Sequence, residues 1–433
     1  MFAQFLLLKK HHGFIRYFKN TSWMMAEQLL RIVAGLFVGI WVVRYMGPEQ
    51  FGLFNYVISF TVIFSGIAKL GLDSILVREL VNNQEKKDVL LGSAFWLKFS
   101  GAIFAVGLIF VTVPFTSNNE KTNAFIFIVA SGMVFQSFEV IEFNFQSQVL
   151  AKIISICKVV QLSLSSIIKI SLIITNKDLV WFVLVTSFDA MSLAVAYVVA
   201  YKFQKNNTFY KHFDLETAKL LLKSSWHLIF YTITVVFYIK IDQIMIKEML
   251  GIYEVGQYSA GIRLAEALFF IPIIIVTSLF PAILNAKKTS HDLYKKRLIR
   301  LFSFLILISI LILIILKLTA RQLILKLFGI EYSSASSVLE IYSFSLPFVF
   351  LAVASSRWLI AENLNKNLLS RSLIAALINI GLNYSLIPVY GINGSAISTV
   401  ITYIYISLIH DLFNTKTRIL LKYKISSTIF WRY

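Results

Sequence analysis

The sequence predicts an all-α membrane protein with about twelve transmembrane helices. Of its 433 residues, 58% are hydrophobic and only 15% are charged, whereas a soluble domain is nearer half apolar and a quarter charged. The apolar residues gather in blocks of about twenty, a length that crosses a hydrocarbon core of roughly 30 Å. Because backbone polar groups in lipid must be paired within their own segment, each block is expected to be a helix.

Short charged stretches separate the expected spans, and lysine and arginine are concentrated in every second stretch. With the N-terminus inside, the inner segments hold roughly 25 of these residues and the outer loops roughly six, and such an asymmetry marks the cationic side as cytoplasmic. We therefore expect a multi-pass protein of the cell inner membrane with both termini in the cytoplasm. The spans are residues 22–43, 52–72, 92–114, 123–145, 153–175, 180–201, 222–244, 258–284, 300–318, 336–360, 369–388 and 392–412.

The two halves of the chain contain an internal repeat. Ser-Trp at residues 22–23 opens the first span and residues 47–52 (GPEQFG) follow it, while Ser-Trp at residues 225–226 opens the seventh span and residues 251–256 (GIYEVG) follow that. The copies lie about 204 residues apart with nearly equal internal spacing. Chance similarity of two apolar spans is the alternative explanation.

Each copy of the repeat holds six expected spans, an even number, so both copies enter the membrane from the same side. The repeat therefore predicts two six-helix bundles related by a pseudo-twofold axis along the membrane normal. The expected domains are an N-terminal bundle at residues 1–201, a basic cytoplasmic linker at 202–221 and a C-terminal bundle with a basic tail at 222–433.

A charged side chain inside a membrane is unfavourable unless it faces a partner, water or substrate, so each one marks a candidate site. Glu27 and Arg31 are four residues apart on one helix face and can form an ion pair that only neutralises both charges. Arg31 can equally be a cavity cation that meets an anionic head group, and the spacing leaves both interpretations open. The candidate substrate-binding cations are Arg31, Lys158, Lys169, Arg263 and Arg357. The candidates for ion coupling or charge pairing are Glu27, Glu139, Glu142, Asp189, Asp242 and Glu266.

A polar stripe follows the fifth span. Lys158, Gln161, Ser165 and Lys169 recur at offsets of 3, 4 and 4 on one helix face, which predicts that this face is turned to water or to another bundle. The acids of the fourth and sixth spans lie at similar depth, so pairing of bases with acids is the alternative to substrate contact. Arg263 begins the eighth span near the outer boundary, where snorkelling or pairing at a gate is also expected.

The sequence excludes several classes of function. The net charge of +19 is distributed between apolar blocks and forms no single basic surface, so no nucleic-acid partner is expected. The six histidines have no metal-ligand spacing, and one cysteine cannot build a cysteine metal site. No Walker A, HExxH or GxSxG motif is present, so we expect no catalytic residue, no metal and no cofactor.

Residues 44–56 (RYMGPEQFGLFNY), followed by 67–72 and 78–80, closely resemble the start of the Wzx-type polysaccharide flippases. The second-half signature of that family is resembled by Asp242, residues 250–251, 254–259 and 263–264, and Glu266. Residues 390–396 (YGINGSA) resemble its turn into the last helix. The resemblance implies a member of the multidrug/oligosaccharidyl-lipid/polysaccharide transporter superfamily, whose members alternate between inward-open and outward-open states. It also implies a cargo of oligosaccharide repeat units on polyprenyl pyrophosphate, with a polysaccharide polymerase and a chain-length regulator as further partners. The product would be O-antigen, capsule or another surface polysaccharide.

Other functions remain open. A lipid II flippase or an ion-coupled drug or cation antiporter belongs to the same superfamily, and for an antiporter the acids Glu139, Glu142 and Asp189 would matter more than the bases. A membrane polysaccharide polymerase acts on the same lipid-linked sugar. Such enzymes need a sizeable outer catalytic loop, and the longest one expected here, residues 319–335, has only about 17 residues. An enzyme is therefore not expected.

Overall fold

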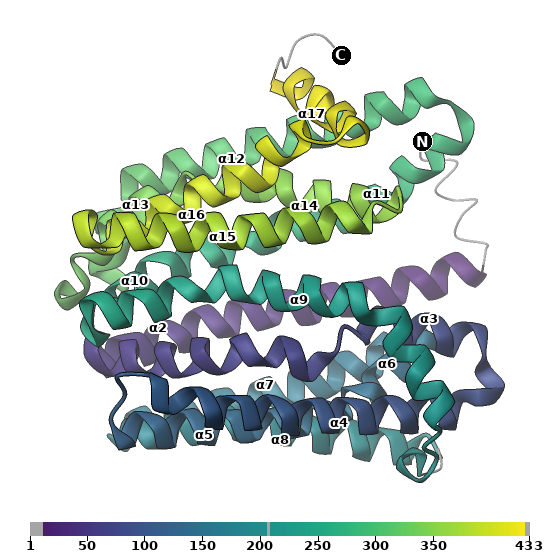
Figure 1. The fold of residues 1–433 in the computed structure, drawn as a ribbon, viewed down its shortest axis with the longest axis horizontal. Coiled ribbons are helices and arrows are strands. Elements are labelled where there is room, and N and C mark those ends of the chain that lie inside the picture. The colour runs from purple at the N-terminus through teal and green to yellow at the C-terminus, as the bar shows by residue number, and fades with distance from the viewer. Residues whose placement is uncertain (1–11, 206–207, 429–433) are drawn as a thin grey trace. The chain divides into compact units, whose positions relative to one another are not determined.

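The computed structural model describes residues 12–205 and 208–428, and within these ranges the regular secondary structure is helical throughout (Figure 1). Short 3₁₀ turns join several of the α-helices. The α-helices are α2 (His12–Lys69), α3 (Asp73–Asn82), α4 (Lys87–Thr112), α5 (Glu120–Phe135), α6 (Val140–Ser147), α7 (Ala151–Ile174), α8 (Leu179–Phe203), α9 (Leu215–Leu250), α10 (Ile252–Glu266), α11 (Phe270–Thr289), α12 (His291–Leu327), α13 (Ala335–Ser343), α14 (Leu346–Ala361), α15 (Asn365–Tyr390), α16 (Ile392–Ser407) and α17 (Thr415–Thr428).

Ten helical segments in these ranges are long and apolar enough to cross a membrane, or eleven when the bent pair α13 and α14 counts as one span. The first segment, Ser22–Asn82, has 61 residues and would reach about 90 Å if it were straight. It is instead kinked at Gly47, where φ is 67° and ψ is 172°, so it supplies the first two expected spans. The expectation of an all-α, multi-pass membrane protein with about twelve spans is therefore confirmed.

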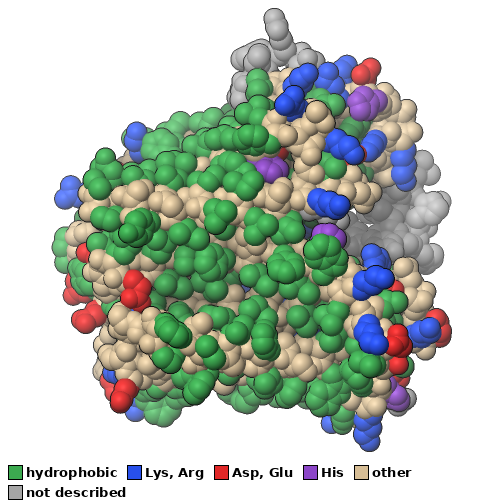
Figure 2. All heavy atoms as spheres, in the orientation of Figure 1, with side chains coloured by type: hydrophobic (Ala, Val, Ile, Leu, Met, Phe, Trp, Pro, Cys, Tyr) green, Lys and Arg blue, Asp and Glu red, His purple; other side chains and the backbone are tan. Residues whose placement is uncertain are grey.

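Some predicted boundaries were wrong. The eighth span is broken by a 3₁₀ turn, Ala267–Phe269, and the tenth bends by 50° between α13 and α14. Helix α12 continues to Leu327, so much of the outer loop predicted at residues 319–335 is helical. The two chain ends, whose cytoplasmic location is predicted, lie outside the described residues. Figure 2 shows hydrophobic side chains over most of the visible face, with most of the visible Lys and Arg near one end of the helices.

The described chain forms two compact units. Among the described residues, unit 1 comprises 12–42, 61–205 and 208–233, and unit 2 comprises 43–60 and 234–428. Buried side chains of α3, α4, α6, α7 and α8 form the core of unit 1, and a cluster from α14, α15 and α16 lies in unit 2. The bundle boundaries expected from the repeat stay a prediction. The contacts add that residues 43–60 pack with the second half of the chain.

Within unit 2, α2 crosses α10 through two glycines. A Cβ added at Gly52 would overlap the carbonyl oxygen of Ile252, and one added at Gly256 would overlap the carbonyl oxygen of Pro48. Only glycine allows two helix backbones to approach this closely. Pro48 and Ile252 occupy equivalent positions in the two repeat copies, and so do Gly52 and Gly256. The contact is therefore reciprocal, as a pseudo-twofold relation requires.

Helix α17 is the last helix of the described chain (Figure 1). A buried ion pair holds it against the rest of unit 2. Lys424 Nζ lies 2.6 Å from Asp411 Oδ2, and their side chains are 1% and 0% exposed. Lys424 also donates a hydrogen bond to the backbone carbonyl of Ser407. Burial lowers the pKa of Lys424 to about 8, although the neighbouring Asp411 carboxylate opposes that shift. The packing of α17 on unit 2 therefore depends on a lysine whose charged form is disfavoured by burial.

Candidate functional site

The deep lysines of the polar stripe in unit 1 are paired with carboxylates of other helices. Lys158 Nζ, on α7, lies 2.6 Å from Glu142 Oε1 on α6, and the second oxygen of Glu142 accepts a hydrogen bond from Tyr197 at 2.6 Å. Lys169 Nζ lies 3.1 Å from Asp189 Oδ2 on α8. The stripe therefore faces protein partners along at least part of its length, and both lysines have their charge compensated.

A third ion pair in unit 1 was not anticipated from the sequence. Lys98 on α4 is 1% exposed, and its ammonium lies 2.8 Å from Glu139 and 3.8 Å from Asp73. The available signal was a single lysine inside the otherwise apolar span 92–114. It has no acid at helical spacing, so the sequence could not show that it pairs with two other elements.

Arg31 and Glu27 form the ion pair that their spacing allows. The Arg31 Nε atom donates to Glu27 Oε1 at 2.8 Å, and the guanidinium makes a second bond to the same oxygen. The Arg31 side chain is 42% exposed and that of Glu27 is 10% exposed. The acid is therefore the partner that would be left poorly solvated if the pair were broken.

Replacing Arg31 by alanine is expected to lower the abundance of the protein in the membrane, because Glu27 would lose the one charge partner that it has among the described residues. The loss leaves the Glu27 carboxylate without a counter-charge inside the expected first span, which is unfavourable. The double variant Glu27→Gln/Arg31→Ala should regain abundance, as quantified by immunoblot of membrane fractions. Restored transport in the double variant would assign Arg31 a structural role, whereas restored abundance without transport would assign it to substrate.

Unit 2 contains a buried carboxylate with one oxygen free of hydrogen bonds. Asp242 is 3% exposed, and its Oδ2 accepts from the Tyr258 hydroxyl at 2.6 Å and from Thr399 Oγ1 at 3.2 Å. Its Oδ1 has no partner among the described residues. A buried carboxyl of this kind can take up a proton or a small cation, which is the property that ion coupling needs. The sequence indicated Asp242 and missed Tyr258 and Thr399, because no spacing rule links α9, α10 and α16.

The candidate cations of unit 2 differ from those of unit 1, because neither is ion-paired within the described chain. The guanidinium of Arg263 lies 5.7 Å from the centre of the Phe51 ring, and no ion pair joins it to Glu266 on the same helix. Arg357 on α14 is exposed and also has no carboxylate partner. The expected pairing of Arg263 at a gate is therefore absent from the described contacts.

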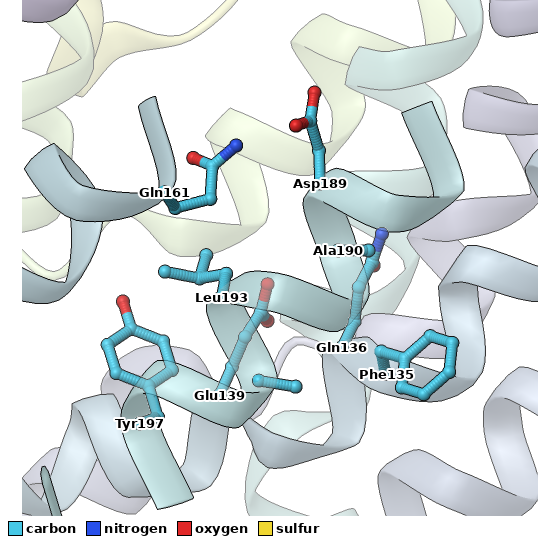
Figure 3. A pocket seen from close by; sticks show the side chains of 9 residues that line it. Phe135, Gln136, Glu139, Gln161, Asp189, Ala190, Leu193 and Tyr197 are labelled. Atoms are coloured by element: carbon cyan, nitrogen blue, oxygen red, sulfur yellow. The ribbon is translucent and has the colours of Figure 1, made fainter. Parts of the chain in front are cut away.

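Two cavities with polar groups in their walls lie in unit 1. One of about 200 Å³ is lined by Phe135, Gln136, Glu139, Gln161, Asp189 and Tyr197, among others (Figure 3). A more open cavity of about 520 Å³ is lined by Lys69, Asp73, Glu139 and Glu142, among others. Glu139 lies on the wall of both. The 3₁₀ turn Gln136–Glu139 separates α5 from α6, and a 3₁₀ break inside a membrane span often marks a functional position.

The structure distributes the predicted site residues over both units. Unit 1 holds Arg31, Lys158 and Lys169 with their acids, and unit 2 holds Arg263 and Arg357 with Asp242 and Glu266. No group of three or more His, Cys, Asp or Glu residues in the described ranges could hold a metal ion. The arrangement provides a buried acid, unpaired guanidinium groups and polar cavities inside a membrane protein, which is the chemistry of a carrier for a polar solute.

Comparison with known proteins gives the same architecture. The family described as polysaccharide biosynthesis protein matches residues 17–287. The lipid II flippase MurJ in an inward closed conformation superposes with a TM-score of 0.71 at 16% identity, covering 94% of this chain and 90% of its own. An inward-facing multidrug resistance MATE family transporter of the MOP superfamily gives 0.68 at 15% identity, covering 92% and 96%.

A MOP superfamily transporter from Pyrococcus furiosus, whose binding pocket is described as having reverse polarity, gives a TM-score of 0.65 at 14% identity, covering 94% of this chain and 95% of its own. No curated protein sequence matches the chain. Identities this low show the fold alone. The chain is thus a multi-pass membrane protein with the fold of these transporters and flippases.

Proposed function

Since the chain belongs to the polysaccharide biosynthesis protein family, we propose that it is a flippase for polyprenyl-pyrophosphate-linked oligosaccharide repeat units. It carries them from the cytoplasmic to the outer leaflet of the inner membrane by alternating access, with both of its termini in the cytoplasm. The translocated units supply O-antigen, capsule or another surface polysaccharide, through a polymerase and a chain-length regulator. Two bundles at residues 1–201 and 222–433 move against each other in this scheme.

The unpaired guanidinium of Arg263 is the observation that supports this cargo best. Within the described chain Arg263 has the Phe51 ring and the Coulombic attraction of Glu266, but no carboxylate in ion-pair contact. Water or a ligand is therefore needed to complete the compensation of its charge in a membrane span. Pyrophosphate is such a ligand, because its oxygens match the planar donors of a guanidinium. The cations of unit 1 have protein partners already, so they are available to an anion only if those ion pairs break.

Asp242 supports coupling of the transport to an ion. Its free carboxylate oxygen, in a buried position, can bind a proton or a small cation in one state and release it in the other. The same residue is the observation that favours the alternative, a cation antiporter. Substrate charge separates the two functions, because an antiporter for organic cations would not need Arg263.

The test is a strain that lacks the gene, complemented with variants of Arg263. The deletion should accumulate lipid-linked repeat units on the cytoplasmic side and lose surface polysaccharide. Arg263→Ala should reduce surface polysaccharide roughly ten- to hundredfold, the loss expected for a charge-assisted hydrogen bond of about 1.5–3 kcal/mol. Arg263→Lys should retain part of the export, because it keeps the charge.

Arg321→Ala is the matched control, since Arg321 is exposed on α12 and should leave export unchanged. Membrane abundance of every variant is measured in parallel. Normal polysaccharide in the deletion strain, with no redundant flippase, contradicts the proposal. Accumulation of lipid II instead of repeat units would identify the other flippase function.

A further inference from the structure

We propose that the cavity of unit 1 between α7, α8 and the 3₁₀ turn Gln136–Glu139 binds one neutral sugar ring of the cargo through the ring's hydroxyl groups. This inference rests on the proposed function for its ligand, because it places part of the oligosaccharide in unit 1. The binding event itself is separable from transport. It can therefore be tested on the purified protein with sugars alone.

The cavity presents hydrogen-bonding atoms that the protein leaves unused. Gln136 Oε1 and Asp189 Oδ1 are buried and have no partner among the described residues. The amide of Gln161 forms no hydrogen bond with any described side chain or backbone group. Gln136, Gln161 and Asp189 line this cavity from three different elements (Figure 3). Buried polar atoms are normally paired, so this space needs a polar occupant.

The unused atoms include both donors and acceptors, which suits hydroxyl groups. The free oxygens of Gln136 and Asp189 accept hydrogen bonds, and the two glutamine amides can also donate them. A hydroxyl group donates one hydrogen bond and accepts others. A sugar ring carries several hydroxyls around its edge and can satisfy such a mixed set. A bare cation could use only the acceptors.

The charge balance of the wall also favours a neutral ligand. Asp189 is already paired with Lys169 at 3.1 Å, and Glu139 is paired with Lys98 at 2.8 Å. The two lysine ammonium groups would repel a cation that entered the cavity, and the two carboxylates would repel an anion. A neutral ring experiences neither repulsion. The cavity therefore suits an uncharged part of the cargo, whereas the guanidinium of Arg263 suits the pyrophosphate.

The size and the remaining walls of the cavity are consistent with one ring. Its volume of about 200 Å³ is below the roughly 300–1,000 Å³ of pockets that hold drug-sized ligands. The apolar surfaces of Phe135, Leu193 and Tyr197 complete the lining and can pack on the C–H face of a sugar. The wider cavity of about 520 Å³ shares Glu139 with this one and offers space for adjoining sugars of the same cargo.

The test measures the thermal stability of the purified full-length protein in lipid nanodiscs. The probes are glucose, galactose, rhamnose and N-acetylglucosamine, each alone, and inorganic pyrophosphate as the charged comparison. At saturation, at least one neutral sugar should raise Tm by about 2 °C or more, because a ligand of the native state stabilises it. The double variant Gln136→Leu/Gln161→Leu should lose this shift and keep any shift caused by pyrophosphate.

The leucine variants are expected to fold, because they remove polar groups that have no partner. The single variant Gln161→Leu provides a second readout if the double variant is unstable, and it should weaken the sugar shift. Gln322→Leu, at an exposed position on α12, is the matched control and should retain it. The proposal is overturned if no neutral sugar raises Tm, or if the shift persists in the folded double variant.

The outcome is also distinguishable from a failure of the proposed function. A deletion strain with normal surface polysaccharide, together with a sugar shift that depends on Gln136 and Gln161, would reject the flippase and keep the sugar site. Loss of polysaccharide in the deletion strain with no sugar shift would keep the flippase and reject the site.

Discussion

Replacing Gly256 by alanine should remove most of the protein from the membrane fraction. The added Cβ would overlap the carbonyl oxygen of Pro48, which belongs to the backbone of α2 and cannot move without displacing the helix. Gly52→Ala should have a similar effect through the carbonyl of Ile252. Overpacking of side chains usually destabilises by about 1–3 kcal/mol, and a clash with helix backbone should reach the upper end of that range or exceed it. Abundance and Tm of the purified variants measure the effect.

Gly381→Ala and Gly107→Ala are the matched controls. Both positions are helical, in α15 and α4, and no atom outside the local helix lies within 4 Å of an added Cβ. Each control should leave Tm unchanged or raise it slightly, because alanine in a helix is favoured over glycine by about 0.5–1 kcal/mol. Wild-type abundance and Tm for Gly256→Ala would show that α2 and α10 do not cross at these glycines.

Replacing Lys424 by methionine should destabilise unit 2 by about 3–5 kcal/mol, because it leaves the Asp411 carboxylate buried without a counter-charge. Asp411 is 0% exposed and its Oδ1 already lacks a partner among the described groups. The double variant Asp411→Leu/Lys424→Met should recover the loss, since apolar replacement of a buried ion pair is often neutral or stabilising. Thermal unfolding of the purified variants is the measurement. A single variant as stable as the wild type would contradict the buried pair.

The membrane spans could be predicted from the sequence because hydrophobicity in blocks of about twenty residues determines them locally. The kink of α2 coincides with Gly47 and Pro48, where the sequence indicated a turn between two spans. The break at Ala267–Phe269 was not predicted, because the apolar block continues through it. Hydrophobicity reports that a segment lies in lipid, and it does not report where the helix changes direction.

Of the ion pairs in the candidate site, the sequence could predict only those within one helix. The pair of Glu27 and Arg31 is visible in the sequence, because residues four apart share a helix face. The pairs that Lys158 and Lys169 form join different helices, and Lys98 was missed for the same reason. Only tertiary packing determines which acid a buried base meets. The sequence could therefore locate the charges in the membrane but could not show which of them are compensated.

The reciprocal crossing of Gly52 and Gly256 also bears on how a chain of this kind can arise and change. In a two-fold dimer of identical chains, residue i meets residue j and j meets i, so one surface provides both sides of the contact. A half-length ancestral chain with a single such glycine would already possess the whole crossing when two copies associate. After duplication and fusion, each glycine remains constrained by the backbone of the other copy. A substitution of either glycine in one half of the chain is consequently restricted by the backbone of the other half.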